Sequence, residues 1–231
     1  MPTNDTFVIA FEGPDKVGKQ TQSQLLFQAL EEKLSTLDVK PQIELFEVPV
    51  RGKVGYEQIY KMLKKQDSED EGLAIKYPEA FQAFQVSNRL ALQQELENKE
   101  ERWKCDYQSG SRYRVPKIVI FDRWTLSSLA YGLASGLEKD FILALNEELW
   151  NPDVWLLFVN ESFKRPEKKD DAYESASSFQ DKVRQNYLQW AEDEMNAQTR
   201  HVFSTPDSIE NTHKKVMNII EKYIEDYLGS R

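Results

Sequence analysis

Residues 7–22 of the chain read FVIAFEGPDKVGKQTQ. A short apolar run leads into Gly13, then into Gly18 and Lys19, and an amphipathic helical pattern follows directly. This spacing is G-x-x-x-x-G-K, placed between a strand and a helix as the motif requires. The glycines let backbone N–H groups turn toward phosphate oxygens, the helix N-terminus adds partial positive charge, and the lysine reaches the terminal phosphates. The stretch therefore predicts a phosphate-binding loop in an α/β protein.

Apolar runs and helical patterns alternate along the rest of the chain. We expect strands at 7–11, 43–48, 117–121 and 154–159, with a weaker strand at 201–204. We expect helices at 20–37, 79–99, 126–133, 141–149, 179–195 and 208–228. Such alternation is typical of right-handed crossovers that build a parallel sheet covered on both faces. The sequence therefore predicts a single three-layer α/β domain over residues 1–231, with a five-stranded parallel sheet between helices.

Length and composition limit the possible functions. The 231 residues are 40% hydrophobic and 12% aromatic, which suits one globular domain. The net charge of -9 disfavours nonspecific attraction to nucleic acid or anionic lipid, so any phosphate site must be local. One cysteine, Cys105, excludes an intrachain disulfide, and the two histidines, His201 and His213, leave too few ligands for a His/Cys metal site. Without a signal-peptide pattern or an apolar run near the roughly 18 residues of a membrane span, we expect no membrane partner and a cytoplasmic location.

Two segments interrupt the alternation. Residues 102–116, RWKCDYQSGSRYRVP, combine basic side chains with Gly, Ser and Pro, and are interpreted as a loop insertion. Residues 161–178, ESFKRPEKKDDAYESASS, are polar and charged, which is compatible with a mobile lid and equally with a solvated loop.

A second chemical signal is IVIFDRW at 118–124, where an apolar strand ends in Asp122 and Arg123. The carboxyl edge of such a strand is where ligands bind in open α/β sheets. Asp122 could orient Mg²⁺ through water, and Arg123 could hold a phosphoryl group with two hydrogen bonds. The competing interpretation is an ion pair at the strand end with no chemical role.

The phosphate-binding motif departs from its usual form at one position. The residue after the lysine is normally Ser or Thr, whose hydroxyl ligates Mg²⁺, and here it is Gln20. Its amide oxygen can approach a hard cation, and Thr21 is adjacent, so both stay open as substitutes.

These motifs resemble the thymidylate kinase family. FEGPDKVGKQTQ is similar to the family's FEGxDxxGKxTQ loop, and DRWTLSSLAYG at 122–132 is similar to its DRYxxSxxAYQ element. The resemblance continues through VPVRG at 48–52, SNR at 87–89, NPDVWLLFV at 151–159, and DAYE at 171–174 followed by FQDKVRQNYL at 179–188. It covers nearly the whole chain except the insertion, and implies a P-loop kinase fold with a short lid.

The resemblance also implies roles for individual residues. It assigns catalysis to Lys19, Lys16, Asp15 and Arg123. It assigns the ATP site to Gly13, Lys16, Val17, Gly18, Lys19, Gln20 and Thr21. It assigns the acceptor site to Asp15, Arg51, Phe84, Gln85, Arg89, Arg123, Ser127 and Tyr131. The metal contact expected at Asp122 and Gln20 comes from the residues themselves, a carboxylate at a strand end and an amide in the loop.

Two further positions depart from the family pattern. Ala172 stands in the lid where an arginine is usual, a loss that Lys16 could offset from inside the loop; Lys164, Arg165, Lys168 and Lys169 are also near. Gln85 stands where an aromatic ring commonly stacks on thymine. Either Phe84 or Phe81 supplies that ring, or the base specificity has changed.

The resemblance implies transfer of the γ-phosphoryl group of ATP to dTMP with Mg²⁺, in a homodimer whose interface includes the helices at 81–97 and 126–133. The residues offer cationic groups and no evident general base, as expected for an acceptor that is already an anion. One alternative is a kinase for another deoxynucleoside monophosphate: dUMP, a modified dUMP or a purine. Another is a nucleotide-binding protein with little kinase turnover, suggested by Gln20 and Ala172.

Overall fold

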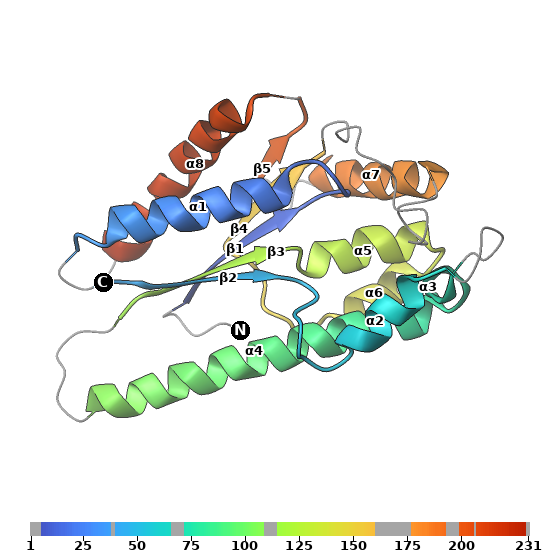
Figure 1. The fold of residues 1–231 in the computed structure, drawn as a ribbon, viewed down its shortest axis with the longest axis horizontal. Coiled ribbons are helices and arrows are strands. Elements are labelled where there is room, and N and C mark those ends of the chain that lie inside the picture. Colours follow the sequence, from blue (N-terminus) through green and yellow to red (C-terminus); the bar gives the residue numbers. More distant parts are fainter. Residues whose placement is uncertain are drawn as a thin grey trace.

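Five parallel strands form one sheet in the computed structural model (Figure 1). The structure describes residues 6–37, 40–65, 72–108, 115–159, 177–192, 199–205 and 207–229. The strands are β1 (Thr6–Glu12), β2 (Gln42–Glu47), β3 (Lys117–Asp122), β4 (Val154–Phe158) and β5 (Arg200–Phe203). Their order across the sheet is β2-β3-β1-β4-β5. The predicted five-stranded parallel sheet is confirmed, with each strand within two residues of its expected position.

Helices cover both faces of this sheet. They are α1 (Lys19–Leu34), α2 (Tyr56–Leu63), α3 (Leu73–Lys76), α4 (Pro78–Gln108), α5 (Thr125–Ala134), α6 (Lys139–Leu145), α7 (Ser177–Glu192) and α8 (Ile209–Gly229). Figure 1 shows α1 and α8 together on one side of the sheet, and α4, α5 and α7 on the other. The predicted three-layer arrangement is therefore confirmed.

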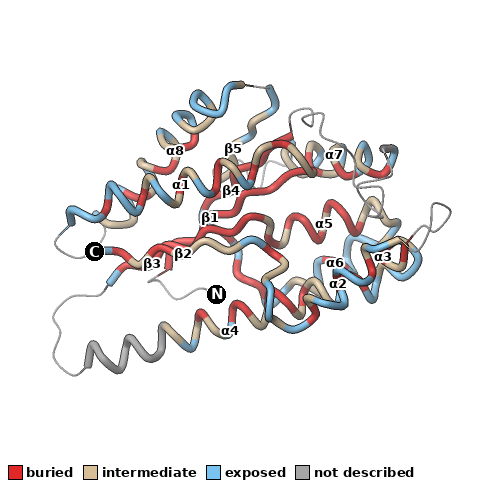
Figure 2. Tube along the Cα trace, viewed as in Figure 1, coloured by how far each residue is buried: buried red, intermediate tan, exposed pale blue. Residues whose placement is uncertain are grey.

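Alternate residues of β1 belong to different cores because successive side chains of a strand point to opposite faces. Phe7, Ile9 and Phe11 pack in the apolar cluster with α1 and α8. Val8 and Ala10 pack in the cluster with the helices of the opposite face. All seven residues of β1 are buried, so this strand is the centre of the molecule (Figure 2).

The strands that follow β1 in sequence are added on both sides of it. After β1 the chain crosses to β2 on one side, and after β3 it crosses β1 to reach β4 on the other. A crevice outside the carboxyl ends of the strands is expected where crossovers diverge in this way, and ligands bind in such crevices. The phosphate-binding loop follows β1 and so lies at this point.

Some predicted boundaries are wrong. The helices α2 and α3 were not expected, and α4 continues to Gln108, so residues 102–108 of the expected loop insertion are helical. Residues 109–114 lie outside the described residues, as do 160–176, which hold nearly all of the expected lid with Lys164, Arg165, Lys168, Lys169 and Ala172. Among the described helices, none has the length and apolarity needed to cross a membrane.

Candidate active site

The loop between β1 and α1 turns on glycines that no other residue could replace without strain. Gly13 has φ 139° and Gly18 has φ 95°, both in the region that favours glycine. A Cβ at Gly13 would lie 1.9 Å from the carbonyl oxygen of Phe158 in β4. Lys16 also adopts a positive φ, 63°, which is uncommon for a residue with a side chain. Strain of this kind is found at functional sites.

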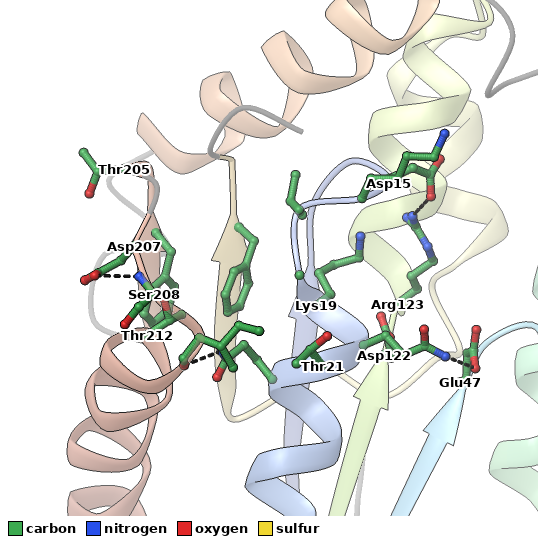
Figure 3. A pocket seen from close by; sticks show the side chains of 18 of the residues that line it. Asp15, Lys19, Thr21, Glu47, Asp122, Arg123, Thr205, Asp207, Ser208 and Thr212 are labelled. Carbon is green, nitrogen blue, oxygen red and sulfur yellow. Dashed lines mark hydrogen bonds and ion pairs between the residues drawn. The ribbon is translucent and has the colours of Figure 1, made fainter. Parts of the chain in front are cut away.

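A cavity of about 720 Å³ opens in front of this loop (Figure 3). Its lining includes every residue from Asp15 to Gln22, the strand ends at Glu47 and Asp122, and the segment after β5. The lining thus includes the expected ATP-site residues Lys16, Val17, Gly18, Lys19, Gln20 and Thr21. In Figure 3, Thr205, Asp207, Ser208 and Thr212 stand on the side of Lys19 opposite Glu47 and Arg123. The cavity therefore extends from the phosphate-binding loop to the start of α8.

Lys19 begins α1 and is only 5% exposed. Its Nζ donates a hydrogen bond to the carbonyl oxygen of Pro14 within the loop. Burial, together with the neighbouring positive charge of Arg123, lowers the pKa of Lys19 to about 8, while Asp122 and Asp15 oppose the shift. A bound phosphate would add further negative charge beside this lysine and favour its protonated form.

Arg123 is fixed by several partners at the end of β3. Its Nη2 pairs with Oδ1 of Asp15, and its Nη1 donates to the Gly13 carbonyl oxygen at 3.2 Å. Tyr131 donates to Oδ2 of Asp15 at 2.8 Å, and the guanidinium carbon lies 5.4 Å from the centre of the Tyr131 ring. Burial raises the pKa of Asp15, but the charges of Arg123 and Lys19 outweigh it and the net shift is downward. Asp15 is therefore an anion that orients Arg123.

A buried carboxylate that we did not expect lies behind this cluster. Glu12 is fully buried and accepts hydrogen bonds from the backbone N–H groups of Trp124 at 2.7 Å and Ser127 at 3.1 Å. It also accepts from the Ser127 hydroxyl at 2.5 Å and the Tyr187 hydroxyl at 3.1 Å. Its negative charge favours the charged form of Arg89. Glu12 thus joins β1 to the N-terminus of α5. A charged residue at the end of an otherwise apolar strand is the sequence feature that could have identified it.

A second cavity, of about 230 Å³, lies beyond Arg123. Its walls come from α2, α4, α5 and the ends of β2 and β3, and include Asp15, Gln85, Arg89, Arg123, Ser127 and Tyr131. Arg89 is 2% exposed and donates from Nη1 to the Ser128 hydroxyl at 2.9 Å, while its Nε has no hydrogen-bond partner among the residues that the structure describes. Burial lowers the pKa of Arg89 to about 10, which still leaves it charged near neutral pH.

Helical spacing decides which ring of α4 reaches the second cavity. Phe81, Gln85 and Arg89 are four residues apart, share one face, and all line it. Phe84 is half-buried against the apolar core beneath α4 and is not among the lining residues. Of the two aromatic candidates, Phe81 lies at the cavity and Phe84 does not.

Several other residues singled out in the sequence lie away from both cavities. Arg51 is exposed, on a loop that Asn88 holds through a 2.7 Å bond from the Val50 N–H. His201 pairs with the Tyr223 hydroxyl at 3.0 Å, and His213 lies on α8. The side chain of Cys105 is outside what the structure describes.

Two cavities meeting at a phosphate-binding loop, with cationic side chains between them, define a P-loop phosphotransferase. The thymidylate kinase family model matches residues 11–216, and the chain belongs to that family. It is an ATP-dependent nucleoside monophosphate kinase that phosphorylates dTMP.

Individual relatives are similar over most of their length. A probable thymidylate kinase of Methanosphaera stadtmanae is 27% identical over 220 residues, covering 94% of this chain and 98% of the relative. One from Methanococcus maripaludis strain C7 is 28% identical over 182 residues, 78% and 74% of the two chains. The solved thymidylate kinase of Candida albicans superposes with a TM-score of 0.65 at 23% identity, covering 95% and 92%, and shares the fold.

Proposed function

We propose that this chain binds ATP in the larger cavity and dTMP in the smaller one, and transfers the γ-phosphoryl group across the wall between them. The observation that carries this proposal is that Asp15, Glu47, Val48 and Arg123 line both cavities. A phosphoryl group must pass from donor to acceptor in line, so the two phosphates have to meet at a shared boundary.

The residues at this boundary supply charge and position. Lys19 would hold the terminal phosphates of ATP, and Arg123, oriented by Asp15, would hold the group in transit or the acceptor phosphate. Lys16, which also lines the larger cavity, would add a second positive charge. The acceptor oxygen of a nucleoside monophosphate is already an anion, so no general base is needed.

Residues of α4 and α5 would select the base. The exposed edge of a thymine offers carbonyl oxygens, and Arg89 Nε, which has no partner within the described part of the chain, is a donor at the wall of the acceptor cavity. Phe81 supplies an aromatic face in the same cavity, so it could stack on the base in place of the ring that the family commonly has at the position of Gln85.

The site also suits Mg²⁺. Asp122 is 5% exposed, lines the ATP cavity and receives no hydrogen bond on its carboxylate among the described residues. A buried carboxylate without a donor is a suitable partner for a hard cation or for its water ligands. Asp122 and the Gln20 amide oxygen would hold Mg²⁺ here. The ion would neutralise the charge of the ATP phosphates.

The family resemblance supports two further proposals. One is a homodimer whose interface includes α4 and α5, and the other is a cytoplasmic location. Light scattering on the purified chain would test the first, since a monomer at micromolar concentration would contradict it.

ADP release from MgATP, with dTMP, dUMP, dCMP, dGMP and dAMP offered one at a time, tests the proposed function. We expect the highest kcat/KM for dTMP. Preference for another monophosphate would retain the phosphoryl transfer and contradict the acceptor assignment. Nucleotide binding without ADP release for any acceptor would contradict the kinase function.

A further inference from the structure

Gln20 occupies the position of the usual metal-binding hydroxyl, and a neighbouring strand fixes its orientation. Its Nε2 donates a 3.0 Å hydrogen bond to Oε2 of Glu47, the last residue of β2. An ionised carboxylate only accepts hydrogen bonds, so the NH₂ end of the amide must face Glu47. The amide oxygen is therefore the end directed away from Glu47, and it accepts no hydrogen bond from the described residues.

Glu47 is also paired in register with Asp122. The two residues are Cα partners at the carboxyl ends of β2 and β3, and adjacent strands are about 4.8 Å apart. Both line the ATP cavity, and Asp122 is the carboxylate that is almost fully buried without a donor. Figure 3 shows Glu47 and Asp122 at the ends of neighbouring strands, with Asp122 between Lys19 and Glu47.

Two carboxylates at this place add negative charge where the phosphates of the proposed reaction must bind, and a metal cation would offset it together with Lys19 and Arg123, whose charges act on Asp122. Glu47 lines both cavities, so it stands near the position where the phosphates of ATP and dTMP meet. Asp122 is 5% exposed whereas Glu47 is exposed, so solvent screens the repulsion between Asp122 and a bound phosphate less than that of Glu47. No group of three or more His, Cys, Asp and Glu able to hold a metal occurs in the described part of the chain. A cation here would therefore need phosphate oxygens and water to complete its ligands, as Mg²⁺ commonly does.

We infer that Glu47 is part of the metal site, where it holds the Gln20 amide oxygen toward Mg²⁺ and, with Asp122, supplies the negative charge that the ion requires. In this arrangement the pair Gln20 and Glu47 replaces the single hydroxyl of the usual motif. The inference rests on the proposed function, because the metal arrives with ATP.

The test compares binding of a non-hydrolysable ATP analogue, AMPPNP, with and without Mn²⁺, by titration calorimetry. Electron paramagnetic resonance of free Mn²⁺ gives the metal affinity independently of turnover. Glu47→Gln removes the charge but leaves an oxygen to accept the Gln20 bond, and Gln20→Leu removes the amide at an exposed position. Glu31→Gln, an equal change of charge at an exposed position late in α1, is the matched control.

We expect Glu47→Gln to weaken Mn²⁺ binding in the AMPPNP complex about tenfold or more, in the range measured when partners of metal ligands are removed. Without metal, the same variant should bind AMPPNP equally well or more tightly, because a repulsive charge has been removed. Gln20→Leu should weaken Mn²⁺ binding, and Glu31→Gln should match the wild type.

Unchanged Mn²⁺ affinity in both site variants would overturn the inference. An equal loss of AMPPNP affinity with and without metal would also overturn it, because Glu47 would then act on the nucleotide or the fold. These outcomes are separate from the kinase assignment. A wild-type chain that binds Mn²⁺ with AMPPNP but phosphorylates no acceptor would contradict the proposed function and leave the metal site standing.

Discussion

At the scale of single residues, Lys19 shows how burial prepares a side chain for an anionic ligand. An ordinary lysine has a pKa of 10.5, and burial lowers that of Lys19 to about 8 in the free site. Bound phosphate favours the protonated amine and so raises this pKa. Above pH 8, nucleotide binding must therefore take up a proton.

This linkage predicts weaker AMPPNP binding at alkaline pH. Between pH 8 and 9.5 the affinity should fall by up to about tenfold for each pH unit, and stay level between pH 7 and 7.5. Calorimetry in two buffers with different ionisation enthalpies would detect the proton uptake. Lys19→Arg, whose guanidinium stays charged, should bind more weakly but without this pH dependence. A wild-type affinity that is constant up to pH 9.5 would refute the assignment.

Glu12 predicts a stability effect at the same scale. Glu12→Leu would leave the backbone N–H groups of Trp124 and Ser127 without an acceptor and remove the charge that faces Arg89. It would also leave the Ser127 and Tyr187 hydroxyls only each other, at 3.0 Å, as an acceptor among the described residues. We expect a loss of about 3 kcal/mol or more in the free energy of unfolding. Glu12→Gln keeps one acceptor oxygen and should lose less. Urea denaturation measures both, and a Glu12→Leu variant as stable as the wild type would show that this network is not needed for folding.

The sequence was informative about residues where a motif fixes the spacing, and less so elsewhere. Arg123 lies where its motif places it because it directly follows β3, a buried apolar strand. Lys19 lies where its motif places it because the motif fixes the length of the loop between the buried strand β1 and α1. The Gln20 to Glu47 bond joins residues 27 positions apart through the pairing of β2, which no local pattern encodes. The exposed position of Arg51 is likewise decided by tertiary contacts of its loop.

At the scale of elements, the turn from β1 into α1 depends on close approach of two backbones. Gly13 and Gly52 both have positive φ, but only Gly13 has a neighbour, the Phe158 carbonyl, where a Cβ would stand. Gly52→Ala should therefore lower the free energy of unfolding by only about 1 kcal/mol, because alanine is strained in the left-handed conformation of this residue. Gly13→Ala adds a steric overlap with the Phe158 carbonyl, and β4 must move to relieve it. We expect this variant to lose more than about 3 kcal/mol in the free energy of unfolding.

Thermal unfolding of the two alanine variants tests this difference. Gly13→Ala should show the larger decrease in Tm. It should also lose AMPPNP binding, because the phosphate-binding loop can no longer pack closely against the Phe158 carbonyl of β4. Equal Tm values for the two variants would mean that the approach of Gly13 to Phe158 is not a constraint.

Helices were predictable in proportion to their length and regularity. The helix α4 was expected to end near residue 99 because the following basic residues, with Gly110 and Pro116 beyond them, resemble a loop. It continues to Gln108 because no glycine or proline interrupts the chain before that point. The helix α2 has only eight residues, of which Ile59 and Met62 are buried, too few to establish a period.

At the scale of the whole molecule, the order of the strands builds the site. A single sequence indicates that strands and helices alternate, but strand order depends on pairing between distant segments. Because β1 lies between β3 and β4, the phosphate-binding loop, the Asp122–Arg123 pair and the β4 end meet at one edge of the sheet. The overall charge of -9 is compatible with binding two anions because Lys16, Lys19, Arg89 and Arg123 are concentrated there.

The most direct test of this account is the fate of the γ-phosphoryl group. Wild-type chain would be mixed with MgATP, labelled at the γ-phosphate, and dTMP in a single turnover, and the products separated. We predict that the label appears in dTDP, and that Lys19→Met, with unchanged circular dichroism, forms at least about a hundredfold less, as for removal of a comparable electrostatic contact. Label recovered as inorganic phosphate, or left in ATP while dTMP is bound, would contradict the account.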